Sequence, residues 1–313
     1  MSEVESVGAC LNCGTALTGP YCSACGQKAQ VYRSLGTFLH DMIAGLFNFE
    51  GKIWRTLPML AWKPGEMTRR YVEGERARFV SPVALYLFSV FLMFAVLNFS
   101  GSMDASGGLE EMAADERADI ARLETERATA AARRTDVAAI DLRIAGKKED
   151  LAELGRLQRG NIVTLDGSEN DQAPAWVREA VAKIQANPQA FIAKVQDAAS
   201  KFSWLLIPLS VPFLWLLFAF ERRYHLFDHT VFVTYSLSFM MILVIAGGLL
   251  VSLGLSSIAS MLFFLPPIHM YRQLRGAYQL GRANALFRTL LLLMFAFVTS
   301  ILFLLAMLAI GIF

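Results

Sequence analysis

The sequence predicts an all-α polytopic membrane protein with about five transmembrane helices, a small N-terminal zinc ribbon and a helical insert outside the membrane. Three observations lead to this prediction. Of the 313 residues, 55% are hydrophobic and only 18% are charged, with a mean hydropathy of +0.44, whereas soluble domains are about a quarter charged. Long apolar blocks alternate with one polar insert that holds most of the charge. All four cysteines lie in a single short N-terminal stretch.

The composition also excludes several classes of protein. Four cysteines in 313 residues are too sparse for a secreted disulfide scaffold. The apolar content and 23 phenylalanines exclude a chain that is disordered throughout. A net charge of +2 does not favour nucleic-acid binding. Glycine-rich phosphate-binding, nucleophile-elbow and dinucleotide-binding motifs are absent from the sequence, so it indicates no reaction.

Residues 1–30 are predicted to form a cytoplasmic zinc ribbon. Two Cys-x-x-Cys pairs lie eight residues apart, a spacing that places four thiolates around one tetrahedral Zn²⁺: Cys10, Cys13, Cys22 and Cys25. Gly14 and Gly26 follow the pairs and permit the positive φ of a tight turn. There are three alternatives. A cytoplasmic location disfavours two disulfides, and the absence of a βαβ pattern disfavours a redox dithiol. The spacing of the cysteines differs from the usual spacings of an iron–sulfur cluster. Four cysteine ligands leave no open position, so the predicted role of the zinc is structural.

Residues 31–81 are predicted to be an amphipathic juxtamembrane region. Ser34 can cap a helix whose apolar face would lie on the inner membrane surface. Trp54 and Trp62, with Tyr71, are placed like interfacial anchors. The region ends in an arginine-rich run that we expect to contact lipid phosphate, an anionic partner or ligand being the alternative: Arg69, Arg70, Arg76 and Arg78.

Five apolar segments without a charged residue are long enough to be transmembrane candidates. They are residues 82–99, 203–220, 230–255, 256–271 and 289–313. The fourth is the weakest because it has 16 residues and contains Pro266-Pro267, so a kinked span and a re-entrant piece are both open. The first 30 residues hold no apolar stretch typical of a signal peptide, so we expect the first span to direct insertion.

Charge predicts the orientation of these spans. Lysine and arginine recur in residues 1–81, in the turn after the second span and in the turn after the fourth. With five spans, all three regions share one side, which the positive-inside rule makes cytoplasmic. The N-terminus is then cytoplasmic, whereas the insert and the C-terminus lie outside.

The insert, residues 100–202, is predicted to be helical and extracytoplasmic. Residues 110–158 are rich in Ala, Glu, Arg and Leu, with an interrupted apolar stripe typical of a helical hairpin or coiled coil. One straight helix, a hairpin and a bent helix are all compatible with the pattern, and Gly146 is a candidate break. Residues 160–174 have the composition of a loop, and Asn187-Pro188 is expected to restart a helix that continues into the second span. The insert is either a solvated spacer that can dimerise or a partner-binding arm.

The N-terminal third also carries a family resemblance. It rests on Cys10-x-Asn-Cys-Gly, on Gly19-x-Tyr-Cys-x-x-Cys-Gly-Gln, and on a later series of residues: Arg33-Ser34, His40, Phe49-Glu50, Arg55-Thr56, Lys63-Pro64-Gly65, Tyr71, Gly74, Arg76 and Ser81-Pro82. This pattern resembles a bacterial family of integral-membrane proteins of unknown function that open with a short zinc ribbon. The resemblance is best over residues 10–95, and the long insert is not part of it. It implies an inner-membrane protein and no activity.

Four histidines form only weak constellations. His225 and His229 lie four residues apart beside Asp228, a spacing that can share a metal, and His40 with Asp41 can join them in space. We favour the simpler interpretation that these are interfacial polar residues at helix ends. His269 lies inside a predicted span and is a functional candidate for that reason.

Three functions are compatible with these features. The first is a non-enzymatic adaptor, scaffold or sensor whose cytoplasmic zinc ribbon docks a protein partner, with a second partner or another copy of the chain at the outer insert. The second is a lipid-handling or transport protein, although coupled transport usually needs intramembrane carboxylates. The third is a membrane-embedded enzyme using His40, Asp41, Glu50 or the 225–229 cluster. Because no chemical signature is present, we place the adaptor first.

Overall fold

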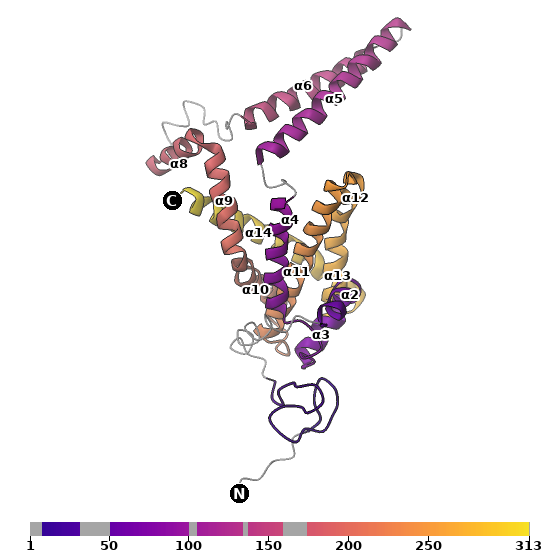
Figure 1. Cartoon of the computed structure of the whole chain (residues 1–313), viewed down its shortest axis with the longest axis vertical. Coiled ribbons are helices and arrows are strands. Elements are labelled where there is room, and N and C mark those ends of the chain that lie inside the picture. Colours follow the sequence, from indigo (N-terminus) through magenta and orange to yellow (C-terminus); the bar gives the residue numbers. More distant parts are fainter. Residues whose placement is uncertain (1–7, 32–50, 100–104, 134–136, 159–173, 313) are drawn as a thin grey trace. The chain divides into compact units, whose positions relative to one another are not determined.

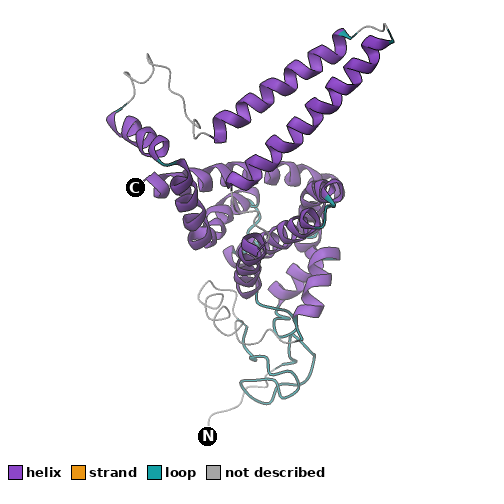
Figure 2. Cartoon of the chain, turned by 45° about the horizontal axis from the view of Figure 1, so that its top comes forward, coloured by secondary structure: helices purple, strands orange, loops and turns teal. Residues whose placement is uncertain are grey.

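The computed structural model describes residues 8–31, 51–99, 105–133, 137–158 and 174–312. Within these residues the regular structure is helical, and Figure 2 draws no strand among them. The predicted all-α class is therefore confirmed for the described chain. The chain divides into two compact units. The bundle unit comprises Met1–Val96 and Lys201–Leu305, and the insert unit comprises Leu97–Ser200 and Ala306–Phe313.

The bundle unit combines long helices with short ones (Figure 1). Its first two described helices, α2 (Ile53–Trp62) and α3 (Pro64–Glu73), are separated by Lys63 alone. Pro64 suits the first turn of α3, where the missing N–H is not needed. The other elements are α4 (Pro82–Phe99), η1 (Ser203–Leu205), α10 (Leu206–Leu217), α11 (Leu226–Ser252), α12 (Ser256–Met261), η2 (Leu262–Phe264), α13 (Leu265–Ala277) and α14 (Arg282–Ile312).

Among the residues that the structure describes, three helical segments are long and apolar enough to cross a membrane: Ala190–Leu217, Leu226–Ser252 and Arg282–Gly311. Their 27 to 30 residues correspond to about 40 to 45 Å at 1.5 Å per residue, which exceeds the roughly 30 Å of hydrocarbon. The predicted first span, 82–99, forms α4, whose apolar part Pro82–Val96 is shorter than these three. The chain is thus built with membrane-spanning helices, and the predicted number of five is not confirmed.

The predicted fourth span is a broken helix. Residues 256–271 divide into the six-residue α12, the 3-10 turn η2 and the first part of α13. The prolines Pro266 and Pro267 lie at the start of α13, where they lack the N–H groups needed to continue a helix from the preceding turn. Helix α13 runs on to Ala277, past the predicted end at residue 271.

Hydrogen bonds bring the loops between the long helices together at one end of the bundle unit. Tyr235 Oη donates to the Val80 carbonyl over 2.7 Å, which ties α11 to the start of α4. Tyr224 Oη donates to the Tyr278 carbonyl, also over 2.7 Å, which ties the turn before α11 to the end of α13. Arg288 of α14 pairs with Glu221. The basic regions that are predicted to share one side of the membrane therefore lie at one end of this unit, which we call the polar end.

Helices α3 and α13 cross at two glycines in the polar end. A Cβ on Gly65 would lie 2.6 Å from Gly276 Cα, and one on Gly276 would lie 2.9 Å from Gly65 Cα. Only glycine permits backbones this close. Beside the crossing, the fully buried Gln273 donates through Nε2 to the Phe232 carbonyl at 3.1 Å and lies 3.3 Å from Thr68 Oγ1. One side chain thus joins α3, α11 and α13.

The arginine-rich run before α4 is largely engaged within the protein. Arg70 contacts both carboxylate oxygens of Glu75 at 2.6 to 3.1 Å. Arg78 lies 3.5 Å from the same carboxylate, and the Arg76 guanidinium lies 4.7 Å from the centre of the Phe227 ring. These three arginines therefore have partners inside the bundle unit, and the lipid contact expected of them stays a prediction.

The Arg70–Glu75 pair predicts a pH-dependent stability. Burial alone would raise the pKa of Glu75, but the hydrogen bonds and charge of Arg70, aided by Arg78, lower it below its usual value. A carboxyl with a lowered folded-state pKa stabilises the fold above its unfolded pKa, and that stabilisation is lost as the pH falls through the folded value. We expect Glu75→Gln to lower the melting temperature at pH 7 and the difference from wild type to close below about pH 4.

Melting temperatures of the detergent-solubilised full chain from pH 3 to 8 would check this expectation. Glu73→Gln is the matched control, because Glu73 is half-exposed and its ion pair with Arg69 spans 3.5 Å. Surface pairs of this kind contribute little. A difference between Glu75→Gln and wild type that stays constant across the pH range would contradict the assignment.

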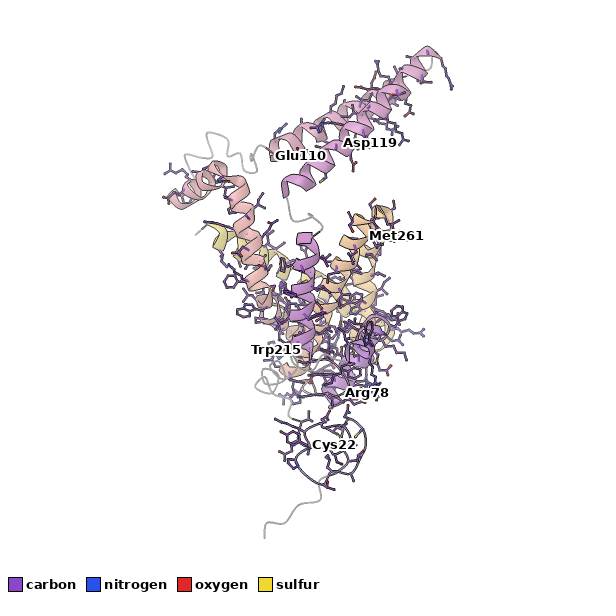
Figure 3. All side chains as sticks on the ribbon, viewed as in Figure 1. Cys22, Arg78, Glu110, Asp119, Trp215 and Met261 are labelled. Atoms are coloured by element: carbon purple, nitrogen blue, oxygen red, sulfur yellow. The ribbon has the colours of Figure 1, made fainter. Side chains whose placement is uncertain are left out.

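The insert unit contains a two-helix hairpin, α5 (Ala105–Ala132) and α6 (Ala138–Gln158). Small and aliphatic side chains are buried between the two helices: Ala113, Ile120, Leu123 and Ile144. Ion pairs join the two helices of the hairpin, since Lys147 Nζ of α6 lies 2.9 Å from Glu116 and 3.3 Å from Asp119 of α5. Figure 3 labels Asp119. Of the three shapes open to the sequence, the hairpin is the one formed, and Gly146 lies inside α6 rather than at its break.

The insert unit also contains α8 (Ala175–Ala186) and most of α9 (Pro188–Phe202). The Asn187 side chain caps α9 by accepting a hydrogen bond from the Ala190 backbone N–H at 3.0 Å. This confirms the predicted helix restart at Asn187-Pro188. Helical residues then continue through η1 into α10, so the candidate span begins at Ala190 rather than at the predicted residue 203.

Candidate metal centre and its anchor

The four cysteine sulfur atoms converge at the N-terminus. All four Sγ atoms lie within 4.8 Å of one another, and Figure 3 labels Cys22 among them. The Cys10–Cys25 and Cys13–Cys22 sulfur separations are 3.7 and 3.5 Å. Four thiolates at about 2.3 Å from a tetrahedral zinc would lie about 3.8 Å apart, so the cluster has the dimensions of a metal site. No disulfide joins any two of these four cysteines in this structure.

Two turns of the same geometry build this cluster. In each, the residue after the Cys-x-x-Cys pair donates its backbone N–H to the carbonyl of the first cysteine, Gly14 to Cys10 at 2.8 Å and Gly26 to Cys22 at 2.9 Å. Gly14 and Gly26 have φ of +76° and +71°. No neighbouring atom would meet a Cβ at either position, so backbone conformation, not crowding, requires glycine. Isolated bridges, Ala9 with Ala16 and Tyr21 with Lys28, close the two turns.

The electrostatics of the cluster favour metal binding. Cys13 Sγ lies 3.3 Å from Thr15 Oγ1. Hydrogen bonds from the Thr15 side chain and backbone stabilise the thiolate and lower the pKa of Cys13 to about 6. A thiolate, rather than a thiol, is the form that ligates a metal. Four cysteine ligands fill a tetrahedral site, so a metal held here has no position left for substrate or water.

A buried glutamine fixes the cysteine knob, residues 8–31, to the polar end of the bundle unit. Gln27 Nε2 donates to the Gly74 carbonyl at 2.8 Å, and its Oε1 accepts hydrogen bonds from the backbone N–H groups of Arg76 and Ala77 at 3.1 and 2.9 Å. The side chain is only 7% exposed. One amide therefore satisfies three backbone groups in the turn between α3 and α4.

The turn that receives Gln27 depends on a glycine. Gly74 ends α3 with φ of +119°, a left-handed conformation in which the chain reverses after the helix. A Cβ at Gly74 would lie 2.7 Å from Leu11 Cδ1 of the knob. Gly74 therefore serves two purposes, because it permits the turn and it leaves room for Leu11 against the bundle unit.

We expect Gln27→Ala to detach the knob without emptying the metal site. The change leaves the Gly74 carbonyl and two backbone N–H groups without their partner, and each lost buried hydrogen bond costs about 1–3 kcal/mol. The cysteine geometry does not use the Gln27 side chain, so metal content should stay at the wild-type level. Hydrogen exchange at Arg76 and Ala77 should quicken by at least about tenfold. Lys28→Ala, at an exposed neighbouring position, should leave both measurements unchanged.

Comparison with known proteins gives a match over a short segment of the bundle unit. Residues 50–94 match a protein family. The family model is "Protein of unknown function (DUF3667)". The matched residues include α2, α3, the turn that receives Gln27 and most of α4, whereas the four cysteines lie before them. No curated protein and no solved structure matches the chain.

The histidines do not form a second metal site in the described part of the chain. There, the four cysteines are the only group of three or more metal-ligating side chains. His225 donates its backbone N–H to Asp228 Oδ2 in a capping box at the start of α11. His229 Nδ1 lies 2.8 Å from Tyr278 Oη, and His269 donates from Nε2 to the Leu60 carbonyl at 2.9 Å.

These contacts assign the three described histidines to helix capping and packing. His40, Asp41 and Glu50 lie outside the described residues. Sequence reasoning missed the role of Gln27, although that residue belongs to the Cys-Gly-Gln motif of the resemblance. The hydrogen-bond partners of Gln27 become known only once the turn after α3 has been located in the structure.

Proposed function

We propose that this chain is an integral-membrane adaptor, a non-enzymatic protein whose zinc-loaded ribbon docks a protein partner at the membrane surface. The observation that carries this proposal is the Gln27 anchor, which fixes the knob to the polar end of the bundle unit. A closed site of four cysteine ligands performs no chemistry of its own. A knob held in one orientation is suited to present a surface, and Leu11 and Tyr21 are each more than half exposed there.

Zinc is the metal that we propose for the four cysteines. Thiolate ligands favour zinc or iron–sulfur chemistry, and a tetrahedral set of four suits both. The spacing of the two pairs matches structural zinc sites rather than the usual iron–sulfur patterns. In this proposal the zinc is a permanent structural element of the ribbon.

The orientation completes the proposal. The basic loops lie together at the polar end of the bundle unit. Under the positive-inside rule, this arrangement supports a cytoplasmic position for the ribbon and the polar end. The hairpin of the insert unit and the C-terminus then lie outside a bacterial inner membrane. A phosphatase fused after residue 313 should be active outside the cytoplasm, whereas one fused after residue 222 should be inactive. The reverse pattern would refute this orientation.

The adaptor proposal can be tested in intact membranes of the producing cells. A photo-crosslinking residue replaces exposed Tyr21, and a matched variant carries it at exposed Leu142 of the hairpin. We expect a protein adduct at Tyr21 that disappears in Cys22→Ser/Cys25→Ser and weakens in Gln27→Ala. Adducts that persist without the metal site, or lipid adducts alone, would overturn the adaptor proposal.

A further inference from the structure

Two pockets adjoin each other at the polar end of the bundle unit. The basic pocket has a volume of 580 Å³, and its wall includes Trp62, Lys63, Arg69, Arg272 and Arg275. The smaller pocket has a volume of 190 Å³, and its wall carries two arginines and two carboxylates: Arg69, Arg223, Glu73 and Asp228. Arg69 and Gln279 line both pockets, so the two form one continuous site. Neither pocket includes a residue of the cysteine knob.

The basic pocket has a surplus of positive charge. Its wall carries one lysine and three arginines, whereas Glu66 is its only acidic residue. Glu66 is already shared, because it lies 3.7 Å from Lys63 Nζ and 3.5 Å from Arg70. Arginine and lysine around an open pocket favour an anion with several oxygens, such as a phosphate group. Trp62 is 69% exposed at its rim, as expected of a side chain at a membrane–water interface.

The smaller pocket contains a buried carboxylate with an unused oxygen. Asp228 is 5% exposed. Its Oδ2 accepts the His225 backbone N–H at 3.0 Å, but its Oδ1 receives no hydrogen bond from any residue that the structure describes. A buried carboxylate oxygen without a donor is costly, and a cationic donor offsets that cost better than a neutral one. The other charged groups of this wall are already paired, Arg69 with Glu73 at 3.5 Å and Arg223 with Glu221 at 3.3 Å. Asp228 is therefore the charge that a ligand ammonium group would complement.

A strained residue lies between the two pockets. Gln279 has φ of +52° at the end of α13, the left-handed position that glycine usually occupies after a helix. The Leu280 backbone N–H bonds the Arg275 carbonyl across this turn at 3.1 Å. Glycine would relieve the strain, but it would remove the only side chain other than Arg69 that lines both pockets.

We propose that this paired site binds the phosphoethanolamine group of a membrane aminophospholipid, with the phosphate in the basic pocket and the ammonium on Asp228. The arrangement complements a zwitterion in which the two charges are joined by a short linker. Its place at the end of membrane-spanning helices, beside Trp62, favours a lipid over a soluble compound with the same group. This site is independent of the partner-docking surface proposed for the ribbon.

Lipid titration of the purified full chain, followed by native mass spectrometry, tests the site. The probes are phosphatidylethanolamine, phosphatidylcholine and phosphatidylglycerol with identical acyl chains. Phosphatidylcholine has no N–H to donate to Asp228, so we expect phosphatidylethanolamine to bind about tenfold more tightly. Asp228→Asn keeps an oxygen for the His225 cap but removes the charge, and it should abolish that preference while leaving phosphatidylglycerol binding unchanged. Arg275→Gln should weaken all three lipids.

A second variant separates binding from folding. Gln279→Gly should raise the melting temperature, because it relieves the left-handed strain, yet it should lower phosphatidylethanolamine affinity. Soluble O-phosphoethanolamine should compete only at far higher concentration than the diacyl lipid. Equal binding of the ethanolamine and choline lipids, or an Asp228→Asn variant with unchanged selectivity, would overturn the proposal. Competition by the soluble compound at equal concentration would overturn its assignment to a lipid.

Discussion

Replacing Cys22 and Cys25 with serine is expected to abolish metal binding and to unfold the knob, residues 8–31. The apolar core of the knob is small, with only Cys10, Leu17 and Cys22 fully buried. Chains below about 40 residues usually need disulfides or a metal to fold. Structural zinc contributes an apparent free energy of about 10–16 kcal/mol in small zinc modules, far more than this core can replace.

Metal analysis and hydrogen exchange on the full chain would measure both effects. The bound metal should fall to zero, and the Gly14 and Gly26 amides, which are hydrogen-bonded in the folded knob, should lose their protection. Ser23→Ala, at an exposed position of the same turn, is the control, and it should retain both the bound metal and the amide protection. The helices should still melt cooperatively, because the bundle unit has its own core. Retained amide protection after metal loss would mean that the knob folds without its metal.

The second large effect is expected from Gly65→Ala. The new Cβ would lie 2.6 to 2.7 Å from Gly276 Cα and from the backbone oxygens of Arg272 and Gln273. All three are backbone atoms, so no side-chain rotation can relieve the overlap, and α3 must move away from α13. Overpacking of a tight site costs about 1–3 kcal/mol or more. We expect a melting temperature several degrees below wild type.

A matched control distinguishes crowding from the general effect of replacing a helical glycine. Gly247 lies inside α11, and a Cβ there would meet only Leu262 Cδ1 at an ordinary 3.8 Å. Alanine is the better helix former by about 1 kcal/mol, so Gly247→Ala should be neutral or stabilising. Thermal unfolding of both variants in the same detergent would decide. Equal melting temperatures for the two variants would rule out the close crossing.

The agreement between sequence and structure is best where the determining contacts are local. The metal centre is contained in 16 residues, and its two turns need only paired cysteines followed by a glycine at positive φ. Helix α9 begins at Asn187-Pro188 because a cap and a proline act within one turn. Membrane-spanning character follows from composition, which no tertiary contact has to establish.

The predictions of where one helix ends and the next begins were less accurate. Residues 256–271 are apolar throughout, yet they form two helices joined by a 3-10 turn. The hairpin of the insert unit breaks between α5 and α6 rather than at Gly146, because pairing of the buried stripe and ion pairs decides where the chain reverses. Composition alone does not distinguish one continuous helix from two shorter helices, since both leave the same residues in apolar or polar surroundings.

The sequence by itself therefore determined that this is an α-helical membrane protein with a four-cysteine site, because ligand spacing, turn glycines and apolar length act over short distances. Only the tertiary structure decided what surrounds that site. Gln27 meets a turn about 50 residues later, and Gly65 meets Gly276 more than 200 residues later. Asp228 gains its pocket from α3 and the end of α13. These contacts form between segments that are far apart in the sequence. Local sequence patterns do not indicate which of these segments will pack together.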